Sequence, residues 1–125
     1  MVETKTLLLT VEEVPVGEAV MRFDSYAPPL DTREIFPVGA PWPSVTKIYK
    51  PGESVYVHYA VKNIGTGPGV GSIEVKDLDT GAVITTWAVP ELAQNERFKT
   101  TPDGSGAYVG KMPDKDWSLS IKVTP

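Results

Sequence analysis

The sequence predicts a single all-β domain, an immunoglobulin-like antiparallel β-sandwich of about seven strands with an extra N-terminal strand or arm. Three observations lead to this prediction. The length of 125 residues suits one sandwich domain. Twelve Pro and eleven Gly are spread along the chain without a period, as expected for short strands joined by tight turns. No stretch of ten or more residues has the spacing of an amphipathic helix.

Strand signatures follow one another along most of the chain. They cover residues 4–14, 19–25, 54–62, 70–77, 82–89, 97–100 and 117–123. The clearest is 54–62, because four β-branched or aromatic residues alternate strictly with other residues and therefore share one face. These four residues are Val55, Val57, Tyr59 and Val61. We expect this strand to be central, with that face turned towards the core.

Turns and connections separate the strands. Leu78-Asp79-Thr80-Gly81 predicts a hairpin turn whose glycine has a positive φ angle. The stretch 27–51 contains six prolines and predicts a long connection that packs against something or has a role of its own. We divide the single domain, 1–125, into N-terminal strands and Pro-rich connection, 1–45, and an immunoglobulin-like core, 46–125. The first part is expected to cover a sheet edge or to reach a neighbouring subunit.

A distinctive order of turn and strand residues runs from residue 50 to residue 89. A Pro51-Gly52-Glu53 turn leads into the alternating strand, and Asn63 and Gly65 close it. This order resembles the cell-adhesion-related domain of bacteria and archaea, an immunoglobulin-like module of surface and extracellular proteins. The resemblance implies a role in adhesion or spacing and no catalytic residues. On physical grounds, the Asn63 side chain is expected to bond nearby backbone and shape the turn that Gly65 completes.

Composition excludes several classes of function. The net charge is −4, so no basic surface is expected that would bind nucleic acid. The chain has no Cys, which excludes disulfides and thiolate chemistry. Its densest aliphatic run is too short to span a membrane, and residues 1–14 do not read as a signal peptide. Two Asn, one Gln and Pro-rich loops together favour a heat-adapted source.

Acidic residues raise two enzymatic or metal-binding alternatives. Asp79-Thr80-Gly81-Ala82 spells the motif of retroviral-type aspartic proteases, in which two subunits each supply one catalytic Asp. That motif normally follows an apolar strand, whereas Lys76-Asp77-Leu78 precedes it here, so we interpret it as a hairpin tip. A calcium site would have to gather carboxylates from separate stretches, namely Asp77, Asp79 and either Asp24 or Asp31. We predict no catalytic residue, no metal and no cofactor.

Aromatic residues and the single histidine supply the candidate binding site. His58 lies beside Tyr56 on the polar face of the central strand, where a half-exposed position is expected and a pH-sensitive interface contact is the alternative. Trp87 and Trp117 fall on apolar faces and are expected in the core. Trp42, in the Pro-rich connection, is expected to be exposed. The candidate binding residues are Trp42, Tyr49, Tyr56 and His58.

We therefore predict a non-enzymatic β-sandwich module for protein–protein or surface binding and assembly. The first alternative is a structural subunit of a larger assembly, such as a virion decoration protein or a surface layer. The second alternative is a carbohydrate-binding module. The expected partner is another protein or further copies of this chain in a homo-oligomer, with a glycan as the alternative and without nucleic acid or a membrane span. An extracellular surface or a virion is the favoured location.

Overall fold

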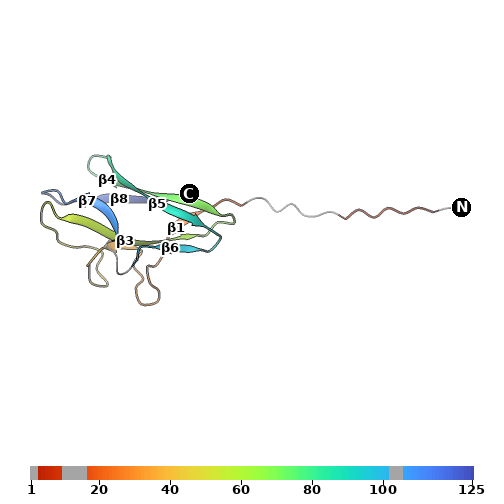
Figure 1. Ribbon diagram of the computed structural model, residues 1–125, viewed down its shortest axis with the longest axis horizontal. Coiled ribbons are helices and arrows are strands. Elements are labelled where there is room, and N and C mark those ends of the chain that lie inside the picture. The colour runs from red at the N-terminus through yellow and green to blue at the C-terminus, as the bar shows by residue number, and fades with distance from the viewer. Residues whose placement is uncertain (1–2, 10–16, 102–105) are drawn as a thin grey trace.

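The computed structural model describes residues 3–9, 17–101 and 106–125. Two layers of strands lie face to face, and residues 3–9 extend away from them (Figure 1). The described residues form eight strands and no helix. The described residues therefore include no helix that could cross a membrane. The prediction of an all-β sandwich is confirmed.

The two sheets are both antiparallel. The strands are β1 (Met21–Phe23), β2 (Ile35–Pro37), β3 (Ser54–Asn63), β4 (Gly69–Asp77), β5 (Val83–Leu92), β6 (Arg97–Lys99), β7 (Ala107–Lys111) and β8 (Leu119–Thr124). In the first sheet β3 is central, with β1 and β2 along one edge and β6 and β7 along the other. In the second sheet β4 lies between β5 and β8. The outer positions of the first sheet are therefore each built from two short strands.

The core lies between β3 and β4. Val61 of β3 and Ile73 and Val75 of β4 are 0 % exposed. The ring of Tyr59 stacks on Trp87 of β5, with 5.4 Å between ring centroids and 3° between planes, so this pair joins the two sheets. The face of β3 that alternation assigned to the core is buried, as predicted.

The predicted N-terminal strand 4–14 is wrong in its described part. Residues 3–9 form no strand and are exposed, and the rest of that stretch lies outside the described residues. Alternation makes a segment suitable for a sheet, but a strand also needs a neighbour whose backbone groups pair with its own. The next predicted strand, 19–25, is shortened to β1, and Met21 is buried there.

Two strands were not predicted. The Pro-rich connection 27–51 contains β2, which pairs with Val57, His58 and Tyr59 of β3. The other, β7, carries the positive-φ Gly110 beside an extra residue in its pairing with β3, which obscures the period of two. Trp117 precedes β8 rather than lying within it, yet it packs on the apolar cluster around Val55, so its expected core position is confirmed in part.

Asn63 closes the far end of β3. Its side chain is 0 % exposed, and its Oδ1 accepts hydrogen bonds from the backbone N–H of Val20 (3.1 Å) and of Gly65 (3.0 Å). Its Nδ2 donates to the carbonyls of Gly67 and Leu92, both at 2.9 Å. The predicted role of Asn63 in shaping the turn is confirmed, and the same amide also fastens two more distant segments.

Glycine is required where this turn passes residues 17–20. A Cβ on Gly65 would lie 2.1 Å from the carbonyl oxygen of Glu18, and one on Gly67 would lie 1.9 Å from that of Gly17. Neither backbone oxygen belongs to a flexible side chain, so the close approach needs glycine at both positions.

The hairpin between β4 and β5 has the predicted turn. Gly81 has a φ of +73°, and its N–H donates to the carbonyl of Asp77 at 2.7 Å. Asp77 also accepts the N–H of Asp79 through Oδ1 at 2.8 Å, which is the local bonding expected of an Asp in a turn. The stretch that spells the protease motif is thus the tip of a hairpin.

Candidate functional site

Part of the outer face of β3, at His58 and Ala60, is buried as well as its inner face. Ala60 and His58 point away from the second sheet, and Tyr26 and Phe36 pack over them to form a small separate core. His58 is only 6 % exposed, so the expected half-exposed position is wrong. The reason is that the connection after β1 folds back across this face instead of leaving it to solvent.

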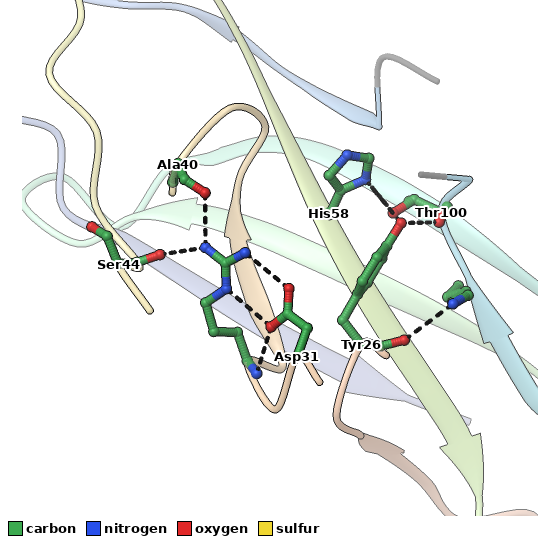
Figure 2. Close-up of polar contacts among 8 residues, drawn as sticks. Tyr26, Asp31, Ala40, Ser44, His58 and Thr100 are labelled. Atoms are coloured by element: carbon green, nitrogen blue, oxygen red, sulfur yellow. Dashed lines mark hydrogen bonds and ion pairs between the residues drawn. The ribbon is translucent and has the colours of Figure 1, made fainter. Parts of the chain in front are cut away.

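A hydrogen-bonded group of three residues lies beneath this cover (Figure 2). His58 Nδ1 lies 2.8 Å from Thr100 Oγ1 and 3.4 Å from Tyr26 Oη. The Tyr26 hydroxyl donates to the Thr100 carbonyl, and Thr100 Oγ1 also accepts the N–H of Tyr59 at 3.3 Å. The hydrogen bonds are satisfied together when the Thr100 hydroxyl donates its proton to an unprotonated Nδ1 of His58. It therefore suits neutral His58.

Burial lowers the pKa of His58, and the positive charge of Arg33 lowers it further. A protonated ring would carry a hydrogen on Nδ1, which could no longer accept from Thr100. Burial and the charge of Arg33 thus favour the neutral form of His58, and the contact with Thr100, the residue after β6, links that segment to β3.

Arg33 anchors the Pro-rich connection through Asp31, Ala40 and Ser44, the three partners that Figure 2 labels. Its Nε and Nη2 donate to the two oxygens of Asp31 at 3.0 and 2.9 Å, and its Nη1 donates to the carbonyls of Ala40 and Ser44. The guanidinium carbon lies 3.6 Å from the ring centroid of Phe36. The side chains of Arg33 and Asp31 are only 9 % and 19 % exposed, and the bonds from Arg33 lower the pKa of Asp31. One cation therefore fixes the loop against β2.

The segment after Ser44 crosses an opening between the two sheets. Here a pocket of about 240 Å³ lies between two edge strands, β2 of the first sheet and β8 of the second. Its lining includes Tyr49, Val57, Met112, Trp117 and Leu119. The connection lines its outer lip with Val45, Thr46, Lys47 and Tyr49. Most of the surface that the pocket presents is therefore apolar.

The size of this pocket limits what it can hold. Sites for drug-sized ligands usually enclose about 300–1,000 Å³, whereas an apolar cavity of about 150 Å³ holds one benzene-sized molecule. At about 240 Å³, this pocket suits one or two apolar side chains. A smaller, more polar hollow adjoins it at Tyr49 and Met112 and includes Asp114 and Asp116 in its lining.

The four predicted binding residues fall in different places. Trp42 is 59 % exposed on the connection, as expected. Tyr49 lines the pocket, where burial and then the nearby charge of Glu53 raise its pKa. Tyr56 and His58 lie on the opposite face of β3, and Tyr56 packs against Tyr108 with 5.1 Å between ring centroids. The structure does not gather the four into one site.

Sequence reasoning missed Arg33 and the pocket. The spacing of Arg33 two residues after Asp31 was a local signal for the ion pair, but its bonds to Ala40 and Ser44 depend on how the loop turns. The segment 45–49 carried no strand signal, because its apolar residues Val45, Ile48 and Tyr49 do not alternate with polar ones. Nothing local indicated that this segment faces Trp117.

The acidic residues considered for calcium have other partners. Asp24 pairs with Arg97 at 2.7 Å and Asp31 with Arg33, while Asp79 lies 4.0 Å from Lys115. Across residues 3–9, 17–101 and 106–125, the structure contains no group of three His, Asp or Glu side chains that could hold a metal ion.

A second apolar feature lies far from the pocket along the chain. Leu7, Leu8 and Leu9 are 83, 80 and 83 % exposed. The segment 3–9 that contains them lies clear of the sandwich (Figure 1). We refer to residues 3–9 as the arm. Burying one Leu side chain is worth about 1.5–3 kcal/mol, so the arm leaves a large stabilisation unused. Three adjacent exposed leucines are typical of a segment that is covered by another surface.

Comparisons of the chain with protein-family models, with curated proteins and with solved structures find no match. The resemblance of residues 50–89 to the cell-adhesion-related domain therefore stays a prediction. The case for a function depends on the pocket, the arm and the chemistry of the residues around them.

Proposed function

We propose that this chain is a non-enzymatic binding and assembly module that holds an extended apolar segment of a protein partner in the pocket between β2 and β8. One observation carries the proposal: the pocket is apolar and lies between two strands that are each paired on one side only. An edge strand offers free backbone groups to an extended segment, and a neighbouring pocket takes its side chains. A peptide in β conformation would use both.

The chemistry of the pocket supports binding rather than catalysis. Its lining is dominated by aliphatic and aromatic side chains, with Thr46 and Lys47 at the outer lip. His58 lies on the other face of β3, with Nδ1 occupied by Thr100. The volume suits side chains of a peptide better than a drug-sized substrate.

Selection from a display library of extended nonapeptides tests the proposal. The target is the full chain with Leu7, Leu8 and Leu9 changed to Ser, so that its own arm does not compete. We expect enriched peptides with apolar residues at alternate positions, and we expect Val45→Lys in the same background to abolish their binding. Val45 is an exposed residue of the lip, so this change adds a charge to the pocket mouth without altering the core. A library that yields no Val45-dependent peptide would refute the proposal.

The exposed arm favours one kind of binding and assembly module, namely a structural subunit of a larger assembly. A chain that carries both an apolar arm and an apolar pocket can join many partners in succession. A virion or surface-layer role would be one instance of such repeated association.

Carbohydrate binding is a second candidate function, favoured by one observation. Trp42 is 59 % exposed, and an exposed indole ring can stack on a sugar. Screening the chain on a glycan array, with Trp42→Ala as the matched control, tests this candidate. Binding that survives the substitution, or no binding at all, would remove it.

A further inference from the structure

We propose that the partner segment is the N-terminal arm of a second copy of this chain, so that copies join head to tail. This inference rests on the proposed function, because it names the occupant of the same pocket. The arm supplies three exposed leucines, and the pocket has room for one or two apolar side chains.

The arm and the pocket lie at opposite ends of β3. Met21, at the start of the first sheet, pairs with Asn63 at the end of β3, and the arm precedes Met21 in the chain. The pocket is lined by Val55 and Val57 near the beginning of β3. In Figure 1 the arm lies beyond the end of the sandwich that carries β1 and the C-terminus. An arm placed there is positioned to meet another copy.

Alternation determines which leucines enter. In an extended segment, residues two apart point to the same side, so Leu7 and Leu9 share a side with Lys5, while Leu8 points the other way. We place Leu7 and Leu9 in the pocket of the second copy, against residues such as Trp117 and Leu119. Leu8 then serves as an internal control, since it has the same chemistry and exposure.

Charge complementarity fixes the direction of the arm. With Leu7 in the apolar pocket, we place Lys5 at the adjoining hollow, whose lining includes Asp114, Lys115 and Asp116. The Lys115 ammonium lies 4.0 Å from Asp79, outside this hollow, so the two aspartates can take a second cation. Among the described residues, neither aspartate forms an ion pair within its own chain. An Lys5 ammonium group would give them a counter-charge. Because such a contact at the rim stays solvated, it guides orientation more than affinity.

The resulting contact is heterologous, with the arm of one copy in the pocket of the next. Such contacts generate rings when the rotation closes and open filaments when it does not. Each copy has one arm and one pocket, so inactivating one of the two on each of two molecules must stop growth at a pair.

Solution mass of the full chain, measured by light scattering over a range of concentrations, tests this inference. We expect wild type to exceed the chain mass of 13.6 kDa increasingly with concentration. The double variant Leu7→Ser/Leu9→Ser and, separately, Val45→Lys should each remain at 13.6 kDa. Leu8→Ser should associate like wild type, and Lys5→Glu should weaken association about two- to five-fold.

A mixing experiment separates head-to-tail association from other contacts. The Leu7→Ser/Leu9→Ser variant keeps its pocket, and Val45→Lys keeps its arm. Mixed together, they should form a one-to-one complex of twice 13.6 kDa and nothing larger. Circular dichroism of each variant establishes that it is folded.

Three outcomes would overturn the inference: wild type that stays monomeric at all concentrations, a mixture that does not associate, or Leu8→Ser that is as defective as the double variant. If wild type stays monomeric while selected library peptides still bind the pocket, the arm is the wrong occupant and the proposed function stands. If no peptide binds either, both fail.

Discussion

The two ends of strand β3 are closed in different ways. At Asn63, one buried side chain satisfies backbone groups from three other segments, and glycines bring the chain so close that no space is left. At Val55 and Val57, the sheets instead leave a pocket of about 240 Å³ between edge strands. Directional hydrogen bonds thus fix the first end, whereas the second has room for further apolar atoms. The first end should tolerate almost no change, and the second should accept additions.

The largest expected effect comes from breaking the closed end. Asn63→Ala leaves the buried N–H of Gly65, the partly buried N–H of Val20 and the carbonyls of Gly67 and Leu92 without the amide that they share. Each unsatisfied buried group costs about 1–3 kcal/mol before relaxation, so we expect the free energy of unfolding to fall by about 3–5 kcal/mol. Chemical denaturation measures this loss.

Lys62→Ala is the matched control for that substitution. Lys62 is the preceding residue of β3 but has no part in the Asn63 hydrogen bonds, so its loss should change the free energy of unfolding by no more than about 0.5 kcal/mol. Equal losses in the two variants would show that the Asn63 amide has no special role at this end.

The open end depends on Arg33, which holds the connection that forms the lip of the pocket. Arg33→Met removes the bidentate pair and leaves the Asp31 carboxylate without its counter-charge. Breaking such a largely buried pair costs about 3 kcal/mol. We expect a loss of this size in denaturation, together with a rise of the Asp31 pKa towards its ordinary value, measured by NMR titration.

The double variant Arg33→Met/Asp31→Leu isolates the role of charge. It removes the stranded carboxylate along with the cation, and apolar replacements of a buried pair are often tolerated. We expect it to be more stable than Arg33→Met alone. If the double variant is only as stable as Arg33→Met, the loss comes from the hydrogen bonds to Ala40 and Ser44 that both variants lack, not from the stranded carboxylate. If it is less stable still, Asp31 contributes through its own bond to the backbone N–H of Arg33 at 3.1 Å.

The contrast between the two ends also explains which features were predictable. The inner face of β3 and the bond from Asn63 to Gly65 follow from local patterns, a period of two and a short polar side chain beside a turn. The pocket brings together Tyr49 and Trp117, which are far apart in the sequence. No local sequence pattern indicates that two such distant residues meet. Features determined within a few residues were predicted, and features determined by packing were not.

The arm and His58 both show that sequence patterns do not reveal which segments pack together. The arm is more exposed than its pattern predicts, and His58 is more buried. The arm has the alternation of a strand but has no strand paired to it, so its described residues stay exposed. His58 lies on a face that reads as polar, yet Tyr26 from the connection after β1 and Phe36 from the neighbouring strand β2 cover it. In each case the local pattern was read correctly. What the sequence did not show was which other segment packs against that residue or fails to pair with it.

One pair of identical substitutions compares the ends directly. Val57→Ile adds a methylene beside the pocket, and burying it should raise the free energy of unfolding by about 0.8 kcal/mol. Val61→Ile adds the same group on the same face of β3 where Val61 is 0 % exposed, and overpacking should lower the free energy by about 1–3 kcal/mol. Denaturation of both variants checks the opposite signs. Two changes of the same sign would contradict the distinction between a filled and an unfilled end.

The smallest expected effect is a dependence on pH that the Asn63 end lacks, because an amide does not titrate. Burial, with the charge of Arg33, lowers the pKa of His58 below its unfolded value of about 6.5, so the unfolded chain binds the proton more readily. The contribution of His58 to stability is therefore fully present above about pH 6.5 and is lost as the pH falls through the folded pKa.

Denaturation curves of wild type and His58→Gln across pH 4–8 measure this dependence. His58 is the only histidine, so the difference between the two curves isolates its titration from that of the carboxylates. We expect the advantage of wild type over the variant to shrink as the pH falls below about 6.5. A constant difference would mean that His58 has the same pKa in the folded and unfolded chain, and that its contact with Thr100 does not discriminate between neutral and protonated imidazole.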